Sequence, residues 1–262
     1  MPNAPDWRAL LRAARPLLPA PALLTGGSGR LGQELRQLLP ELLAPARDEL
    51  DILDPGEWLE HERPRLIIHA AAFTDVAAAE KQRDECWAIN VHGTRRLARA
   101  AAACGAFFIL ISTDYVFSGD EGGYREDDTP GPVRNHYALS KLAAEEAARA
   151  ALPPGRLLVI RTSFRAREWP HARAFTDLHT SQDYIDRLAP QLALAACLAE
   201  RMPFDTVHIA GPRRSSFELA RERRPDVQPA SRLEAPVDLP ADVSLDTSRW
   251  LAFIREQAML LG

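Results

Sequence analysis

Wholly apolar segments alternate with helical patterns along this chain, and this alternation constrains the fold more than any other feature of the sequence. Strands are expected in the apolar segments, at residues 22–24, 65–70, 107–112, 156–161 and, less distinctly, 42–45 and 207–210. Helices are expected between them, at residues 30–39, 85–104, 136–151 and 183–201. Strands that are apolar on both faces have to be covered on both faces. The pattern therefore predicts an α/β fold with a doubly wound parallel sheet.

The bulk composition excludes several classes of function. The 262 residues are 46% hydrophobic, which is enough for one large domain or two small ones. The net charge of -4 gives no electrostatic footprint for nucleic acid, and no apolar run is long enough to span a membrane. Residues 1–20 are expected to be an N-terminal extension with a short amphipathic helix, and they lack the continuous apolar core of a signal peptide.

Cysteine and histidine show no metal-binding pattern. Cys86, Cys104 and Cys197 are too few and too scattered for a disulfide framework or a zinc site. The seven histidines have no metal-ligand spacing, and we expect each of them at the surface or in a loop. The sequence therefore predicts no metal site and a reducing, cytoplasmic setting.

A glycine-rich loop follows the first predicted strand and opens the first predicted helix. Gly26, Gly29 and Gly32 lie in the stretch TGGSGRLG at residues 25–32. Glycines at such positions allow a tight turn, a close approach of backbone to a pyrophosphate, and close packing of helix on strand. The helix N-terminus then directs free N–H groups at the negative charge. The loop predicts a dinucleotide site, the alternative being an ordinary strand–turn–helix connection.

Charged residues after the second apolar segment are candidates to read the adenosine end of a dinucleotide. An acid there favours a free ribose hydroxyl, whereas an arginine favours a 2′-phosphate. Arg47, Asp48 and Asp51 supply both charges, so the sequence does not decide between them. Arg30, inside the glycine loop, favours NADP, with NAD as the alternative. Each of these side chains could equally be a solvated surface charge.

A phenol and an ammonium lie one helical turn apart just past the middle of the chain. Tyr137 and Lys141 are four residues apart in a predicted helix, so they share one face. A tyrosine phenol has a pKa of about 10, and we expect the neighbouring ammonium to lower it. Thr113 ends the strand predicted at residues 107–112, at the sheet edge where α/β folds bind ligands, and can hydrogen-bond a substrate carbonyl.

These residues together resemble the extended short-chain dehydrogenase/reductases, and more closely the dTDP-4-dehydrorhamnose reductase family. The resemblance covers residues 20–164. Its matching stretches are TGGSGRLG at 25–32, LDILDP at 50–55, HAAAFTDVAAAE at 69–80, AINVHGTRRL at 88–97, STDYVFSG at 112–119, YREDD at 124–128, YALSKLAAE at 137–145 and RTS at 161–163.

The resemblance implies a Rossmann-type fold and reduction of the C4 ketone of a nucleotide-linked 6-deoxysugar with NADPH or NADH. Tyr137 would be the general acid, Lys141 its partner and Thr113 the carbonyl anchor. The cofactor would be held by Tyr137, Lys141 and by Gly26, Ser28, Gly29, Arg30, Leu31, Gly32, Arg47, Asp51, Ile52, Ala70, Ala71, Ala72 and Asn90. The substrate would be held by Thr74, Tyr115, Phe164, Arg165 and Arg167. Sugar-nucleotide 4,6-dehydratases carry a glutamate where this chain has Tyr115, so the resemblance argues against dehydration.

The chain departs from the family after residue 164. The helix that usually follows the Arg-Thr-Ser strand is not evident, TSQDYIDRLA at 180–189 resembles the family's return helix, and DVSLDTSRW at 242–250 resembles its C-terminal segment. We expect a Rossmann domain over residues 1–163 and a small, shortened substrate-binding region over 164–262, interleaved with the core near 183–210. The Pro-rich segment 225–240 is expected to be a linker or an irregular flap.

Two matters stay open at the level of sequence. Arg161, Arg165, Arg167 and Arg173 form a basic stretch that could bind a substrate diphosphate or simply be a solvated arginine loop. The shortened substrate region also fits a non-catalytic dinucleotide-binding regulatory subunit, like that of methionine adenosyltransferase, or a reductase or epimerase of another sugar ketone. The expected partner is a nucleotide-sugar, and a homodimer is left open.

Overall fold

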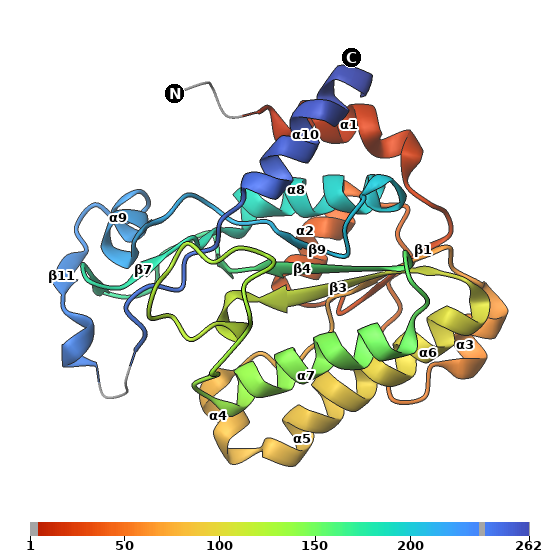
Figure 1. Cartoon of the computed structure of the whole chain (residues 1–262), viewed down its shortest axis with the longest axis horizontal. Coiled ribbons are helices and arrows are strands. Elements are labelled where there is room, and N and C mark those ends of the chain that lie inside the picture. Colours follow the sequence, from red (N-terminus) through yellow and green to blue (C-terminus); the bar gives the residue numbers. More distant parts are fainter. Residues whose placement is uncertain (1–4, 236–238, 262) are drawn as a thin grey trace.

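Five parallel strands form the centre of the molecule. The computed structural model describes residues 5–235 and 239–261. The strands are β1 (Ala22–Thr25), β2 (Leu66–His69), β3 (Phe107–Thr113), β4 (Leu157–Thr162) and β9 (Thr206–His208), in the order β1-β2-β3-β4-β9. Every neighbouring pair in this sheet is parallel (Figure 1). The predicted parallel α/β sheet of the Rossmann type is thus confirmed.

Helices cover both faces of the sheet (Figure 1). One face carries α2 (Arg30–Leu38) and α8 (Ile185–Cys197), and the other carries α3 (Gly56–Glu62), α6 (Thr94–Cys104) and α7 (His136–Ala151). Because successive strand residues point to opposite faces, Ile68 packs in the core beneath α8 and Ile67 in the core beneath α6. Both are at most 2% exposed, which explains why the strand sequences are apolar throughout.

The segment at 42–45, expected as a weak strand, contributes a single bridge to the sheet. Leu43 pairs with Leu23, its N–H donating to Ala22 O at 2.9 Å and its carbonyl accepting from Leu24 N at 2.8 Å. Pro40 and Pro45 flank this segment, and a proline cannot donate to a ladder. The segment therefore borders β1 without extending the sheet by a full strand.

The long helix expected at 85–104 is continuous but contains a wider turn. After α4 (Val76–Lys81), it comprises α5 (Arg83–Trp87), a π-helical segment over Ala88–Gly93 and then α6. Gly93 lies against Ile52, because a Cβ built on Gly93 would lie 2.7 Å from Ile52 Cδ1. π-helical turns occur often at functional sites, and this one places Asn90 behind the loop that follows β2.

The N-terminal extension is part of the core. The amphipathic helix α1 (Trp7–Ala14) is capped by the Asp6 side chain and buries Leu11 and Ala14. Trp7 stacks on Trp250 of α10 (Ser248–Leu261), with ring centroids 6.2 Å apart. Figure 1 shows α1 and α10 together outside α8. This pair of helices adds a further apolar layer to that face of the sheet.

A small lobe follows β4 and contains three two-stranded sheets. They pair β5 (Phe164–Arg165) with β8 (Asp183–Tyr184), β7 (His179–Thr180) with β10 (Arg214–Ser215), and β6 (Arg173–Phe175) with β11 (Gln228–Ala230). The lobe also carries α9 (Ser216–Arg221). The described residues 166–184 contain no helix, as expected, and the return helix α8 begins at Ile185 rather than at residue 180. Within the predicted linker 225–240, β11 and a 3-10 turn over Arg232–Glu234 are ordered, and residues 236–238 lie outside the described residues.

Two histidines correct the expectation that all of them lie at the surface or in loops. His69 on β2 is 1% exposed, and its ring nitrogens lie 2.7 Å from Thr25 Oγ1 and 3.0 Å from Thr94 Oγ1. His208 on β9 is fully buried. Burial lowers the pKa of both rings to about 3, so each is neutral near pH 7. Among the described helices, none is long and apolar enough to cross a membrane.

Candidate active site

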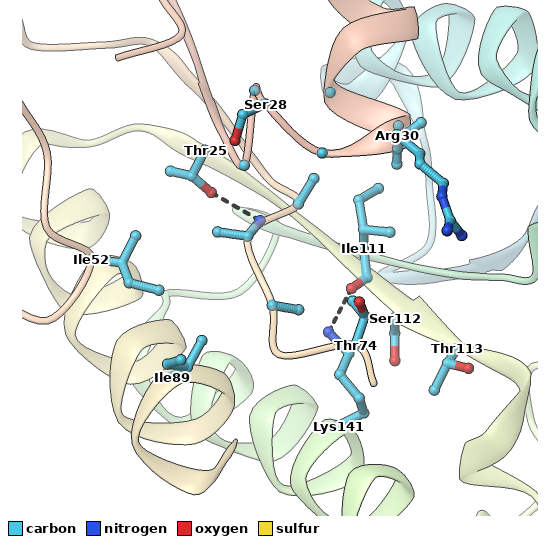
Figure 2. Close-up of a pocket in the computed structure, with 18 of the residues that line it drawn as sticks. Thr25, Ser28, Arg30, Ile52, Thr74, Ile89, Ile111, Ser112, Thr113 and Lys141 are labelled. Atoms are coloured by element: carbon cyan, nitrogen blue, oxygen red, sulfur yellow. Dashed lines mark hydrogen bonds between the residues drawn. The ribbon is translucent and has the colours of Figure 1, made fainter. Parts of the chain in front are cut away.

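A cleft of about 1130 Å³ runs along the carboxyl edge of the sheet, where the ends of β1 to β4 meet. It is lined by the glycine loop, residues 44–47, 49–53, 70–72 and 74–76, the end of β3, the first turns of α7 and residues 162–164. Figure 2 shows the loop at one end and Lys141 with Thr113 at the other. Parallel α/β sheets bind their ligands at this edge.

The backbone of the glycine loop requires glycine at two positions. Gly26 has φ +75°, and a Cβ there would lie 2.6 Å from Ala71 N. A Cβ on Gly32 would lie 2.2 Å from the Gly26 carbonyl oxygen. Gly29 is the N-cap of α2, and its N–H donates to Gly26 O at 3.0 Å. The first turn of α2 therefore opens onto the cleft with unbonded N–H groups, as an anion site needs.

The floor of the cleft is formed by Ala70, Ala71 and Ala72, as predicted for these positions. Ala71 N donates to Thr25 Oγ1 at 3.4 Å (Figure 2). The buried His69 ring also hydrogen-bonds Thr25 Oγ1 through its Nδ1, at 2.7 Å. Small side chains on this floor leave room for a flat ring system. The buried hydrogen bonds beneath it fix the loop after β2 to the end of β1.

Asn90, predicted to contact the cofactor, lies behind the cleft wall instead. It is 1% exposed, and its amide is bonded to Phe73 N at 2.7 Å, Phe73 O at 3.1 Å and Ser140 Oγ at 2.8 Å. Its neighbour Ile89 lines the cleft. Asn90 therefore fixes the floor loop to α7. The prediction of direct contact is wrong because it depended on a tertiary packing that the motif alone does not specify.

The adenosine end contains a basic residue that sequence reasoning missed. Arg47, Asp51 and Ile52 line the cleft as predicted, whereas Asp48 does not. Asp51 Oδ1 accepts a hydrogen bond from Leu53 N at 2.8 Å. Arg36 also lines the cleft, and a Cβ on Gly27 would lie 3.5 Å from Arg36 Cδ. Arg36 follows Gly29 by seven residues, which is two helical turns, so helical spacing could have found it.

Thr113, Tyr137 and Lys141 meet at the opposite end of the cleft. Thr113 ends β3, while Tyr137 lies in the first turn of α7, which Asn135 caps through Ala138 N at 2.8 Å. Lys141 is 4% exposed, and its Nζ donates to Ile111 O at 2.8 Å (Figure 2). The predicted trio is therefore assembled by two elements, one strand end and one helix start.

The electrostatics of the trio differ from the expectation in one respect. Burial raises the pKa of the Tyr137 phenol, the carboxylate of Asp114 raises it further, and a hydrogen bond with Thr113 opposes the rise. The net shift is thus opposite to the lowering expected from Lys141, whose ammonium donates to the Ile111 carbonyl. Burial lowers the pKa of Lys141 to about 8, although Glu145 acts in the opposite direction. Burial raises the pKa of Asp114 to about 6.

The predicted substrate residues divide into two groups. Thr74, Tyr115 and Phe164 line the cleft, and the Tyr115 ring meets the Tyr137 ring edge-on at 6.3 Å. Arg165 and Arg167 lie outside the lining. The missed residues Ser163 and Gln182 line it, with Gln182 Nε2 donating to Ser163 Oγ at 3.1 Å. No sequence motif marks Gln182, since it falls in the shortened stretch.

The basic stretch after β4 is mostly neutralised by ion pairs. Arg161 is buried against Glu145, which corrects its interpretation as a diphosphate ligand. Arg167 makes a bidentate pair with Glu34 at 2.8 and 2.9 Å, and Arg173 pairs with Glu234 at 2.6 Å. Arg165 differs: its guanidinium lies 4.3 Å from the Trp169 ring centroid, and its Nε is buried with no hydrogen-bond partner. It makes no ion pair with any residue that the structure describes.

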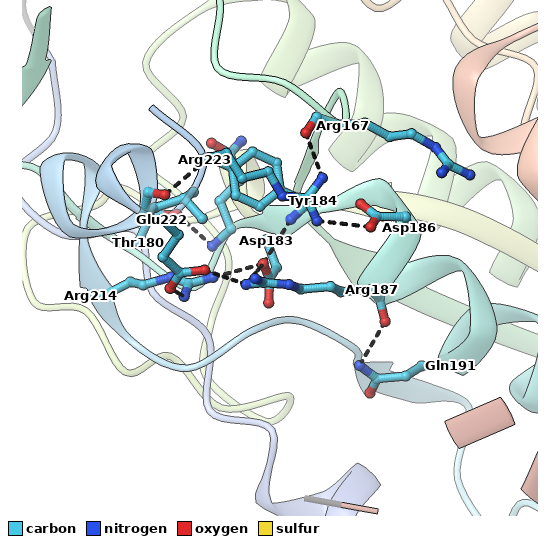
Figure 3. A network of polar contacts seen from close by, with 12 residues as sticks. Arg167, Thr180, Asp183, Tyr184, Asp186, Arg187, Gln191, Arg214, Glu222 and Arg223 are labelled. Atoms are coloured by element: carbon cyan, nitrogen blue, oxygen red, sulfur yellow. Dashed lines mark hydrogen bonds and ion pairs between the residues drawn. The ribbon is translucent and has the colours of Figure 1, made fainter. Parts of the chain in front are cut away.

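A charge network beside the cleft holds the lobe to the start of α8 (Figure 3). Asp183 pairs with Arg187 at 3.2 Å and with Arg214 at 2.7 Å, and both arginines also pair with Glu222. Arg223 lies over the Tyr184 ring, 3.9 Å from its centroid. This network immediately follows Gln182 of the cleft wall. In residues 5–235 and 239–261, no cluster of three or more His, Cys, Asp or Glu side chains could hold a metal ion.

Comparison with known proteins finds similarity to dTDP-4-dehydrorhamnose reductases and to a subunit of methionine adenosyltransferase. The family model described as RmlD substrate binding domain matches residues 21–192. A dTDP-4-dehydrorhamnose reductase of Streptomyces griseus is 41% identical over 139 residues, covering 50% of this chain and 45% of that protein. Methionine adenosyltransferase 2 subunit beta of Pongo abelii is 34% identical over 139 residues, covering 48% of this chain and 41% of that protein. The chain spans about half the length of these curated relatives.

Solved structures are similar over most of both chains. A dTDP-4-dehydrorhamnose reductase of Bacillus anthracis in complex with NADP has a TM-score of 0.75 at 28% identity, covering 86% of this chain and 89% of that one. A hypothetical dTDP-4-dehydrorhamnose reductase of Sulfolobus tokodaii has a TM-score of 0.76 at 31% identity, covering 88% and 93%. With the family model spanning most of the sheet and the whole cleft floor, the chain belongs to the RmlD substrate binding domain family.

Proposed function

We propose that this protein is an NAD(P)H-dependent reductase of the C4 ketone of a nucleotide-activated deoxysugar, a reaction of deoxysugar and surface-polysaccharide biosynthesis. The observation that carries the proposal is the cleft itself. Its glycine loop lies at one end, and Thr113, Tyr137 and Lys141 lie together at the other. The names of the related reductases support the same reaction.

The residues of the cleft fit a dinucleotide. A Cβ on Gly26 or Gly32 would fill the space beside the first turn of α2, so the chain keeps this cradle open for a pyrophosphate. Arg30, Arg36 and Arg47 line the cleft and make no ion pair within the described residues. These cations favour the 2′-phosphate of NADP, and Asp51 keeps NAD as the alternative. When bound, the cofactor supplies the hydride.

The chain's own groups supply the proton and hold the ketone. As C4 is reduced, the C=O π pair would move to oxygen, and the Tyr137 phenol would transfer its proton there. The raised pKa of Tyr137 keeps the phenol protonated throughout the neutral range, as a proton donor requires. Thr113 Oγ1, which donates to Asp114 at 3.0 Å, lies beside this phenol and can turn to the ketone oxygen. Lys141 then stabilises the phenolate until solvent returns a proton.

We assign the nucleotide-sugar to the lobe end of the cleft. Thr74, Tyr115 and Phe164 line this end. Tyr115 and Asp114 act electrostatically on Arg165, which makes no ion pair within the described residues. A half-buried guanidinium of this kind suits a diphosphate. Residues 164–262, without α8 and β9, are accordingly proposed as the substrate region.

Oxidation of NADPH and NADH with a dTDP-4-keto-6-deoxysugar tests this proposal, in the native protein and in Tyr137→Phe. Substrate-dependent oxidation that disappears in the variant supports the reductase and shows its preferred cofactor. Tight cofactor binding without oxidation of this or other sugar ketones overturns it in favour of the regulatory-subunit alternative, which the complete trio does not favour. A cytoplasmic location and a homodimer stay predictions, the latter testable by analytical ultracentrifugation.

A further inference from the structure

We propose that Glu145 is a positioning residue for the reduction, and that it acts through Lys141. Its buried carboxylate lies one helical turn beyond Lys141 and holds that ammonium charged against the end of β3. The inference depends on the proposed function for its catalytic meaning. The proposed effect of Glu145 on the charge of Lys141 involves only residues of this chain, so it can be measured without a sugar substrate.

The geometry ties α7 to β3 at consecutive residues. Glu145 is fully buried, and its Oε1 accepts hydrogen bonds from Ser112 Oγ at 2.5 Å and Arg161 Nε at 3.1 Å. Lys141 Nζ donates to the carbonyl of Ile111, one residue before Ser112. Thr113, the proposed carbonyl anchor, follows directly. Two polar contacts from one face of α7 thus hold Ile111 and Ser112, the two residues that precede Thr113 at the strand end.

The charges explain why a carboxylate is needed there. A buried ammonium is costly unless an anion lies nearby, and Lys141 is directed at a neutral carbonyl. Within the described residues, the titratable groups around Lys141 are Tyr137 and Glu145 of its own helix, Cys86 of α5 and the neutral His69 of β2. Asp114, in the turn after β3, acts on Tyr137 rather than on Lys141. Glu145 is therefore the carboxylate that keeps Lys141 protonated, and its loss lowers the pKa of the ammonium.

Arg161 offsets the energetic cost of burying the Glu145 carboxylate. Its Nη2 donates to Glu145 Oε2 at 2.8 Å, and the two side chains are 4% and 0% exposed. The guanidinium also lies over the Phe117 ring, 5.0 Å from the centroid. Arg161 is the ion-pair partner of the carboxylate and is not among the groups that shift the pKa of Lys141. A purely structural pair would stabilise the fold equally well and leave the titration of Lys141 unchanged, and this difference can be measured.

The composition of the chain makes that measurement simple. Lys81 and Lys141 are its two lysines, against many arginines. Lys81 is exposed and serves as an internal reference. Trace acetylation of the whole protein with acetic anhydride over a range of pH, followed by mass spectrometry of the two peptides, gives the apparent pKa of each amine. Peptide-level detection also separates both lysines from the N-terminal amine.

We expect Glu145→Gln to lower the apparent pKa of Lys141 by about one unit, leaving Lys81 unchanged. In the pH profile of kcat/KM for ketone reduction, the apparent pKa of the alkaline limb should fall by the same amount. Glu146→Gln is the matched control, because Glu146 is the next residue of the helix, is largely exposed and pairs loosely with Arg149 at 3.6 Å. A Lys141 titration in folded Glu145→Gln equal to that of the native protein would overturn the inference.

A second variant keeps the test valid if Glu145→Gln does not fold. Glu145→Gln combined with Arg161→Met removes both buried charges, so no unpaired guanidinium remains. The same downward shift of Lys141 is expected in this double variant, and an unshifted titration contradicts the proposal. If the shift is observed while no sugar ketone is reduced, the action of Glu145 on Lys141 stands and the proposed function fails. If the titration of Lys141 is unshifted and the protein does reduce a sugar ketone, the inference about Glu145 fails and the proposed function stands.

Discussion

The cofactor half of the cleft, where we propose that the dinucleotide binds, and the lobe proposed to bind the substrate are held together by different forces. The cofactor half consists of strand ends and helix starts above two apolar cores, in which Leu24, Ile68 and Phe108 are fully or nearly fully buried. The lobe has a smaller apolar cluster around Trp169, Tyr184 and Leu219. It depends more on ion pairs such as Asp183–Arg214. Apolar packing is not screened by salt, whereas partly exposed ion pairs of the lobe, such as Arg187–Glu222, are screened by it.

This contrast suggests where chemistry and specificity are located. The groups proposed for proton transfer and dinucleotide binding lie on elements that the core makes rigid. The groups proposed for sugar recognition lie on short strands and turns that charges hold in place. Changes in the first half should therefore affect turnover or cofactor binding, and changes in the second should affect affinity for the sugar.

The largest effect is expected from Tyr137→Phe in the cofactor half. Removing the phenol oxygen should lower kcat for ketone reduction by about 10²- to 10⁴-fold, because the proton donor is lost. Cofactor affinity, measured by NADPH fluorescence, should change little. A variant that keeps near-native turnover would show that Tyr137 is not the acid.

Gly32→Ala tests the cradle in the same half. The new Cβ would lie 2.2 Å from Gly26 O, so the loop or the start of α2 has to shift. We expect NADPH affinity to fall at least 100-fold and the free energy of unfolding to fall by about 2–4 kcal/mol. Gly56→Ala is the control, since nothing lies within 4 Å of its Cβ position. Native affinity in Gly32→Ala would contradict the close approach of backbone that the cradle requires.

Asp183→Asn tests the lobe. Asp183 pairs with Arg187 and Arg214, and loss of its charge leaves the largely buried Arg214 uncompensated on that side. We expect KM for the sugar to rise about tenfold, with NADPH affinity nearly unchanged and destabilisation of about 1–3 kcal/mol. Asp226→Asn is the control, because its pair with Arg224 is largely exposed. An equal loss of cofactor affinity would mean that the two halves are not independent.

The two halves also differ in how far the sequence could predict them. The positions of Gly26, Gly32, Tyr137 and Lys141 in the cleft could be predicted, because they depend on local backbone geometry or helical spacing. Arg36 obeys the same spacing but was not considered. Asn90, Arg161 and the lobe residue Gln182 could not be assigned correctly, because burial and ion pairing depend on which segment packs against them.

The buried histidines illustrate the same limit and lead to a prediction about stability. The pKa of His69 is about 3 in the folded state, below its ordinary value of 6.5, so the unfolded chain binds the extra proton as pH falls. The contribution is fully present above pH 6.5 and is lost progressively below it. The unfolding free energy of the native protein should therefore fall more steeply than that of His69→Gln, by about 1.4 kcal/mol per pH unit between pH 6 and 5. Urea unfolding at these pH values measures the difference. The opposing titration of Asp114 is common to both proteins and cancels, so equal slopes would contradict a neutral buried ring.

The smallest expected effect concerns the choice between the two dinucleotides. Arg36 and Arg47 line the adenosine end without ion pairs in the described residues, and a 2′-phosphate there would gain an attraction that a ribose hydroxyl would not. Arg36→Ala should weaken NADPH binding about tenfold and NADH binding less than twofold, so that the ratio of the two affinities changes while turnover with saturating cofactor does not. Arg167→Ala, which removes a cation paired with Glu34 outside the cleft lining, is the matched control. Equal weakening of both cofactors in Arg36→Ala would assign Arg36 to the pyrophosphate. Arg47 would then be the candidate for reading the 2′ position, and the cofactor half would contain two separate cationic subsites.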